Sequence, residues 1–205
     1  MNPLMKAMGG TPFANIQAIM NQIGQLRQLA GGGKELKSYG NAKMLSLMRE
    51  AINIEAHGSM WHLKHMLWAQ SHGLQGQKRL NRYESKCDRE HYIKMQDYCI
   101  DMFVEVVEPE WDYIVSVPDD IKGYLESYLE WEDGVYSKLA AISNELIVMG
   151  FPCEAELVRE GLPRKEVEKV RRMLVEYGLS GWDMPYILIR DRELHNQIKA
   201  KEEKS

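Results

Sequence analysis

The most informative feature of the sequence is a series of long segments in which apolar residues recur every three or four positions. That spacing is the period of an amphipathic helix, so each segment is predicted to bury one face. The predicted helices span residues 37–72, 76–105, 119–150, 152–177 and 185–199.

The connections between these segments predict how the helices are arranged. Leu74–Gly76 is short and favours antiparallel neighbours, whereas Glu110–Pro118 is long for a bundle and suits a crossover that leaves the third helix parallel to the second. The pattern therefore predicts an all-α fold. It consists of a four-helix bundle with a long crossover between the second and third helices and a short fifth helix at the C-terminus.

The fourth segment contains two residues that disfavour a continuous helix, Gly161 and Pro163. An interior proline removes one backbone hydrogen bond and clashes with the preceding turn. We therefore expect either a kink in this segment or two helices with a break near Gly161.

Each of the four bundle segments carries an acidic residue within its apolar stripe. With the histidine that follows the second acid by three positions, these residues are Glu55, Asp88, His91, Glu132 and Glu166. Burial strips water from an ionised carboxylate, which is costly unless a partner or a metal ion neutralises the charge. A single D-x-x-H is often a surface pattern without a role, but it is also half of the inward-facing di-metal arrangement of helical bundles. Acids at similar depth on four helices favour a shared metal site.

The residue types in this set also indicate the metal. Four carboxylates with one imidazole suit iron or manganese, whereas zinc more usually takes additional histidine or cysteine ligands. The predicted cofactor is a di-iron centre, with manganese as the alternative.

The N-terminal residues differ from the rest of the chain. Phe13–Leu29 has the spacing of a short amphipathic helix, and Gly31–Gly33 forms a flexible hinge. The extension is either a loosely held tail or a docking helix for an unknown partner or a neighbouring subunit. We divide the chain into this extension at 1–34, a bundle at 35–198 and a charged tail at 199–205.

Composition narrows the class of protein further. The chain has 205 residues, 44% of them hydrophobic, and a formal net charge of −4, so it can bury a core and has no strong basic field for nucleic acid. Three cysteines without C-x-x-C spacing exclude a four-cysteine metal centre and favour a reducing compartment. Apolar runs are too short to span a bilayer, and the N-terminus lacks the apolar centre of a signal peptide. We expect a cytoplasmic protein without a membrane or nucleic-acid partner.

Several motifs resemble the ferritin family, specifically the non-haem bacterial ferritins. They are I-N-I-E-A-H at Ile52–His57, W-A-Q-S-H-G-L-Q-G at Trp68–Gly76, D-R-E-H-Y-I-K-M-Q-D-Y at Asp88–Tyr98, Y-L-E-W-E-D at Tyr128–Asp133 and R-D-R-E-L at Arg190–Leu194. The resemblance covers about residues 40 to 198. The separations from Glu55 to His91 and from His91 to Glu132 match those of the family's ferroxidase ligands without a gap.

The resemblance implies a ferritin-like bundle with specific roles for these residues. Glu55 and His91 would bind the first iron, Asp88 would bridge, and Glu132 with a fourth-helix glutamate would bind the second. The implied reaction is oxidation of Fe(II) by dioxygen or peroxide, with storage of the product as ferric mineral. The implied assembly is a homo-oligomer, either a dimer or a cage-like shell.

The chain also departs from the family. Asp88 stands where ferritins usually carry glutamate, and His62 replaces a tyrosine beside the first metal. We expect His62 to be a hydrogen-bond partner of a ligand, an extra ligand or a packed histidine. The fourth helix lacks the family's acidic run, so the remaining ligand is Glu166, Glu168 or neither. The glycine-rich extension is not a ferritin feature.

Other functions compete with this prediction. A ferritin-fold structural or adaptor protein, host- or phage-encoded, would bind through its N-terminal helix and carry a degenerate metal site. A rubrerythrin-like peroxidase would need a cysteine-bound iron domain, and a DNA-protecting mini-ferritin would arrange its metal ligands differently.

The other histidines and the tryptophans of the first helix have simpler expected roles. We expect His57, His65 and His72 to be solvated or to cap helices, and Trp61 and Trp68 to pack at a helix or subunit interface.

Overall fold

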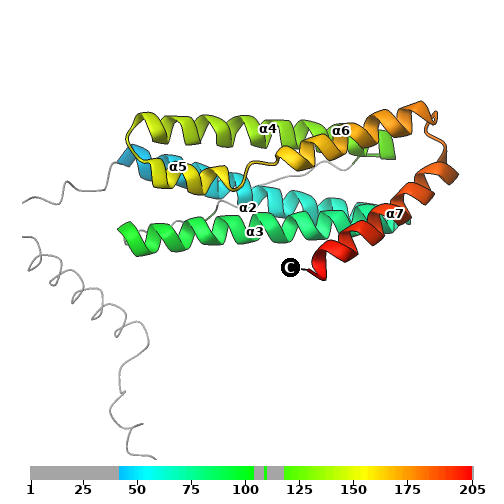
Figure 1. The fold of residues 1–205 in the computed structure, drawn as a ribbon, viewed down its shortest axis with the longest axis horizontal. Helices are drawn as coiled ribbons and strands as arrows, with labels where there is room; N and C mark the ends of the chain where they lie inside the picture. The colour runs from blue at the N-terminus through cyan, green and yellow to red at the C-terminus, as the bar shows by residue number, and fades with distance from the viewer. Residues whose placement is uncertain (1–41, 104–108, 110–117, 205) are drawn as a thin grey trace, which may run out of the picture. The chain divides into compact units, whose positions relative to one another are not determined.

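The computed structural model describes residues 42–103, 109 and 118–204. The predicted docking helix and the first residues of the predicted 37–72 helix lie outside these ranges. Within them the chain is helical apart from short connections, and the described residues form one compact unit (Figure 1). The helices are α2 (Ala42–Ser71), α3 (Gln75–Phe103), α4 (Ile121–Val148), α5 (Pro152–Arg159), α6 (Arg164–Leu179) and α7 (Met184–Glu202).

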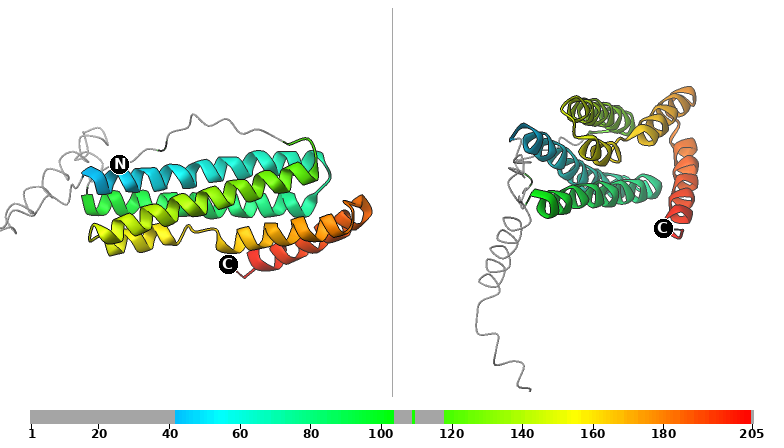
Figure 2. Two further views of the ribbon diagram at one scale, coloured as in Figure 1. Left: turned by 90° about the horizontal axis from the view of Figure 1, so that it is seen from above. Right: turned by 60° about the vertical axis from the view of Figure 1, so that its left-hand side comes forward.

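The direction of each helix agrees with the predicted bundle. A tight turn joins α2 to the antiparallel α3, and Gly73 adopts a φ of 73° there, a conformation that glycine reaches without steric cost. Figure 2 shows that α4 runs in the same direction as α3, so the predicted crossover topology is confirmed. Segments α5 and α6 return antiparallel to α4 and together form the fourth helix of the bundle.

The fourth helix is interrupted at the predicted position. Helix α5 ends at Arg159 and α6 begins at Arg164, with Pro163 immediately before it. The residues between the two helices form a tight turn, in which the Gly161 amide donates a hydrogen bond to the Val158 carbonyl at 3.2 Å. The break near Gly161 is therefore confirmed as two helices rather than a kink.

Helix α7 packs against the start of α3. The buried Asp191 carboxylate accepts hydrogen bonds from the amides of Gly76 and Gln77, both at 2.8 Å. These amides belong to the first turn of α3, whose N–H groups have no partner within the helix. Helix α7 is longer than predicted and continues to Glu202, so Lys199–Glu202 of the predicted charged tail forms its last turn.

The apolar core consists of two clusters, one toward each end of the bundle. The first cluster, nearer to α7, includes Trp61, Trp68, Leu80, Tyr124, Tyr128, Val170 and Tyr177. The second cluster includes Met44, Met48, Ile52, Met95, Leu139, Leu146 and Val158. On each helix the residues between the two clusters include the acids singled out by the sequence, so a polar layer separates two apolar layers.

One prediction about the first helix is wrong. His65 is neither solvated nor a capping residue, because it is fully buried and stacks on Trp61 with ring centroids 3.6 Å apart. Trp61 and Trp68 are themselves buried, and each contacts a tyrosine of α4. These tryptophans therefore pack at a helix interface. In the described part of the chain, the helices are too short or too polar to cross a membrane.

Candidate metal centre

Three of the predicted ligands converge between α2 and α3. Glu55 comes from the middle of α2, and Asp88 and His91 lie one turn apart on α3. Each offers one ligand atom, and all three atoms lie within 4.8 Å of one another. The Nδ1 atom of His91 lies 3.4 Å from Glu55 Oε2, and Glu55 Oε1 is buried without a hydrogen-bond partner. An unsatisfied buried carboxylate oxygen is costly, which makes this oxygen a candidate cation ligand.

Two glycines make room for these carboxylates. A Cβ atom on Gly58 would lie 2.6 Å from Asp88 Oδ2, and a Cβ atom on Gly161 would lie 1.8 Å from Glu55 Oε1. Both distances are far below van der Waals contact. Any larger residue at Gly58 or Gly161 would therefore displace a carboxylate of the cluster.

The electrostatics of the cluster indicate a shortage of positive charge. Burial raises the pKa of Glu55, and the neighbouring His91 offsets this only in part. The pKa of Asp88 is raised well above its usual value by burial and then by the charges of Glu55, Glu132, Glu84 and Glu166. Proximity to Glu55 raises the pKa of His91 despite its burial. Divalent cations would relieve this repulsion.

Glu132 lies beside the cluster and contacts His62. Its Oε1 atom is 3.3 Å from His62 Nε2, and the same nitrogen is 3.6 Å from Asp88 Oδ2. Both Glu132 and His62 are buried. Glu132 thus lies in the same layer as the three clustered ligands. The contact that connects it to Asp88 is made by the His62 imidazole, which lies close to both carboxylates.

The hydrogen bonds around His62 define which of its nitrogens faces the carboxylates. The Asn81 amide nitrogen donates to Tyr124 Oη at 2.7 Å and to the Gln77 carbonyl at 2.8 Å, so its Oδ1 atom is the acceptor for His62 Nδ1 at 3.2 Å. With the proton on Nδ1, Nε2 is free either to carry a second proton or to bind a metal. Burial lowers the pKa of His62, but Glu132, Glu84 and Asn81 outweigh it, and the net shift is upward. His62 can therefore serve as the cationic partner of these carboxylates or as a ligand.

The fourth helix contributes less than the other three. Glu166 is half-buried, and its charge raises the pKa values of both Asp88 and Glu84, so it faces the polar layer. Glu168 is exposed. The sequence left Glu166, Glu168 or neither as the fourth-helix ligand, and of the two glutamates Glu166 is the one near the cluster.

Glu84 is a residue of this layer to which the sequence analysis assigned no role. It is buried one turn before Asp88, and its Oε1 atom lies 3.3 Å from Lys169 Nζ on α6. The sequence spacing does indicate this position, because residues 84, 88 and 91 follow one another at steps of four and three and so share one face of the helix.

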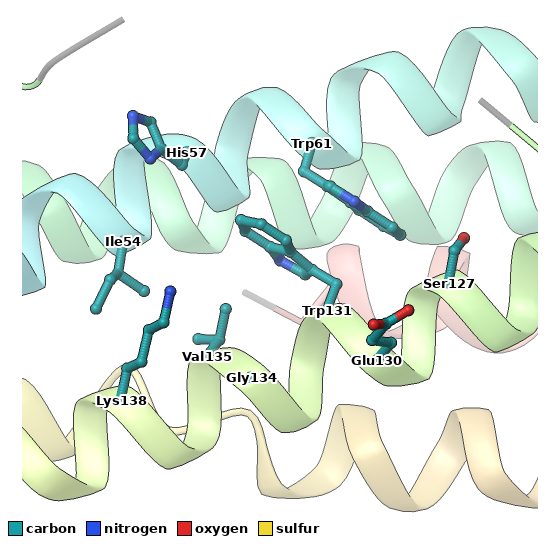
Figure 3. Close-up of a pocket in the computed structure, with 9 residues that line it drawn as sticks. All are labelled: Ile54, His57, Trp61, Ser127, Glu130, Trp131, Gly134, Val135 and Lys138. Atoms are coloured by element: carbon teal, nitrogen blue, oxygen red, sulfur yellow. The ribbon is translucent and has the colours of Figure 1, made fainter. Parts of the chain in front are cut away.

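A separate groove of about 380 Å³ lies between α2 and α4 (Figure 3). The Trp61 and Trp131 rings form part of its wall and are nearly parallel, with centroids 5.8 Å apart. Its lining contains none of the predicted metal ligands. Because Trp61 is buried between this groove and His62, the aromatic layer divides the groove from the carboxylates.

Comparisons with known proteins bear on the fold. No protein-family model matches the sequence, and no curated protein matches it. An open-pore ferritin from the hyperthermophilic archaeon Archaeoglobus fulgidus matches the structure with a TM-score of 0.68 and 19% identity, over 77% of this chain and 97% of that one. A closed form engineered from the A. fulgidus ferritin matches with a TM-score of 0.64 and 20% identity, over 75% and 94%. A humanized archaeal ferritin gives 0.67 and 19%, over 76% and 96%.

These matches span nearly the whole length of each ferritin and most of this chain. At such low identities they establish the architecture and leave the activity open. The likeness agrees with the resemblance seen in the sequence motifs. The chain therefore has a ferritin-like fold.

Proposed function

We propose that this protein binds Fe(II) in the polar layer of its bundle and oxidises it, acting as a ferroxidase. The observation that carries the proposal is the convergence of Glu55, Asp88 and His91 donor atoms within 4.8 Å, with one Glu55 oxygen buried and unpartnered. Carboxylates with few nitrogen ligands suit iron, with manganese as the alternative. The ferritin-like fold supports the same conclusion.

The proposed ligands divide into two groups. Glu55 and His91 hold the first Fe(II), and Asp88, which is close to both of these residues and to His62, would bridge to the second. Glu132 and Glu166 hold the second, and His62 faces Glu132 and Asp88 with Nε2. Glu168 is not among the proposed ligands because it is exposed.

The chemistry is oxidation of bound substrate by an external oxidant. A pair of Fe(II) ions supplies two electrons, which convert dioxygen and two protons into hydrogen peroxide, or hydrogen peroxide and two protons into water. The carboxylates stabilise the ferric product through their negative charge. Bound Fe(II) would also supply the positive charge that stabilises Glu55 and Asp88 as carboxylates, whose pKa values burial raises.

Storage is a further part of the proposal. The matched structures include an open-pore ferritin and a form engineered to be closed. By analogy we infer that this chain forms a homo-oligomer in which ferric product is retained as mineral. Light scattering of the purified protein would distinguish a dimer from a cage-like shell.

Anaerobic titration with Fe(II), followed by exposure to air, tests the proposal. We expect a stoichiometry of about two Fe(II) per chain and rapid oxidation. Both should be lost in Glu55→Ala and His91→Ala and kept in Glu50→Ala, which removes an exposed acid from the same helix. Wild-type protein that binds no Fe(II) stoichiometrically would refute the ferroxidase function.

A second candidate is a ferritin-fold structural or adaptor protein with a degenerate site. It is favoured by one observation, the pairing of Glu132 with His62 within the site. In that case wild-type protein would bind no more than one metal per chain, and oxidation would be no faster than in solution.

A further inference from the structure

The break in the fourth helix faces the metal-binding layer. Long side chains bridge α3 to the fourth helix on both sides of the break. On one side Lys94 of α3 contacts Glu160 at the end of α5, and on the other Lys169 of α6 lies 3.3 Å from Glu84 of α3. His91 and Asp88 lie between Lys94 and Glu84 on α3. Two ion pairs therefore connect α3 to the fourth helix on either side of the break, and the cluster residues of α3 lie between them.

The cluster residues differ in how far solvent reaches them. The side chain of Glu55 on α2 is 2% exposed, whereas those of His91 and Asp88 on α3 are 32% and 21% exposed. Solvent therefore reaches the cluster at its two α3 residues.

The break itself has a buried carboxylate directed at it. Glu55 Oε1 has no hydrogen-bond partner, and it occupies the space in which a side chain at position 161 would lie. A continuous helix with an ordinary residue at Gly161 would fill that space. The glycine and the break thus leave room for an unsatisfied carboxylate oxygen directly at the break.

We propose that divalent cations reach the site through this break, and that Glu160 captures them before they pass to Glu55 and His91. The inference rests on the proposed function and adds an access route to it. Glu160 is half-exposed, lies outside the cluster and interacts with the same part of α3 as His91. Lys94 holds this carboxylate when no cation is present and competes with an incoming cation for it.

A residue that only transfers the cation has a distinct kinetic signature. It lowers the barrier for both entrance and exit, so its removal slows association and dissociation equally and leaves the equilibrium affinity unchanged. A true ligand instead changes the affinity, mostly through the dissociation rate.

Stopped-flow binding of Co(II), followed by its visible absorption, measures these rates without any oxidation. At low ionic strength Glu160→Gln should slow association about threefold to tenfold, with a Kd within about twofold of wild type. Lys94→Gln should speed association about threefold, since it removes the competing charge. Glu156→Gln removes an exposed acid from the same helix and should change neither rate.

Each other result overturns the inference. If Glu160→Gln weakens the affinity by raising the dissociation rate alone, Glu160 is a ligand rather than a capture site. If it leaves association at the wild-type rate, cations arrive by another route, although the proposed function stands. If wild-type protein binds no Co(II) and no Fe(II), the proposed function fails together with the route.

Discussion

Gly161 lies so close to Glu55 that a Cβ atom at position 161 would be 1.8 Å from Glu55 Oε1. The Leu139 side chain, 3.4 Å from the same point, limits how far the chain can shift. We predict that Gly161→Ala displaces the Glu55 carboxylate from its position in the cluster. Metal affinity should then fall about tenfold or more, which corresponds to a loss of about 1.4 kcal/mol of binding free energy for each factor of ten. Co(II) titration measures the affinity, and circular dichroism checks that the helices persist.

Gly134→Ala is the matched control for this substitution. Gly134 lies within α4, and a Cβ atom there would have no neighbour within 4 Å. Metal affinity should be unchanged, and the free energy of unfolding should rise by up to about 1 kcal/mol because alanine favours a helix interior. Wild-type affinity in Gly161→Ala would show that the Glu55 carboxylate does not bind the metal.

We predict that the hydrogen bonds between Asp191 and the first turn of α3 stabilise the packing of α7 against the bundle. Asp191→Asn keeps one acceptor but turns an N–H group toward a backbone amide, which should cost about 1–3 kcal/mol of stability. Gly76→Ala should cost at least as much, because its Cβ atom would lie 2.0 Å from the Asp191 carbonyl oxygen. Urea denaturation measures the loss, and hydrogen exchange at Leu194 and Ile198 should report earlier opening of α7.

The exposed Asp101 near the other end of α3 provides a control for that pair of variants. Asp101→Asn should leave the urea midpoint and the exchange of α7 unchanged. Unaltered protection of α7 in Asp191→Asn would mean that apolar packing alone holds this helix.

The helices and the depth of the ligands could be predicted from the sequence because both depend on local periodicity. Glu55, Asp88 and His91 each interrupt an apolar stripe, and the stripes meet in the core. His65 was misjudged for a related reason. Helix α2 contacts both α3 and α4, so its buried surface is wider than one stripe and includes the side that carries Trp61 and His65.

Other features depend on contacts between distant segments, and periodicity does not predict them. The motifs Trp68–Gly76 and Arg190–Leu194 both supported the resemblance to ferritins, but their physical connection is the hydrogen bond from the Gly76 amide to Asp191. Likewise, the contact of His62 with Glu132 depends on how α2 and α4 are rotated against each other.

The ion pair of Glu84 with Lys169 predicts an asymmetry between two substitutions in metal-free protein. The Glu84 side chain is 6% exposed and that of Lys169 is 23% exposed. Lys169→Met leaves a buried carboxylate without its cation and should cost about 1–3 kcal/mol at neutral pH. Glu84→Gln removes the buried charge itself and should cost less, and the double variant should recover much of the loss.

Acidification provides a second measurement on the same pair. Burial raises the pKa of Glu84, and Lys169 lowers it in part. Without the lysine the carboxyl group holds its proton to higher pH, so the penalty of Lys169→Met should shrink as the pH falls. A penalty that is independent of pH would show that lost packing, rather than lost charge, causes it.

His65 predicts a loss of stability in mild acid. Its Nδ1 atom lies 2.9 Å from the Trp61 carbonyl and its Nε2 atom is buried without a partner, so the neutral ring fits the site and the charged ring does not. Burial accordingly lowers the pKa of His65 from its ordinary 6.5 to about 4. As the pH falls below 6.5, His65 is protonated in the unfolded chain, whereas in the folded chain it stays neutral until about pH 4. The free energy of unfolding should fall by up to about 3 kcal/mol over that window and should not fall further on this account below it.

Urea denaturation across this pH range measures the effect. His65→Phe, which keeps a ring against Trp61, should lack this part of the pH dependence. The exposed His72 supplies the control, since His72→Phe should retain it, and parallel curves for wild type and His65→Phe would contradict the prediction.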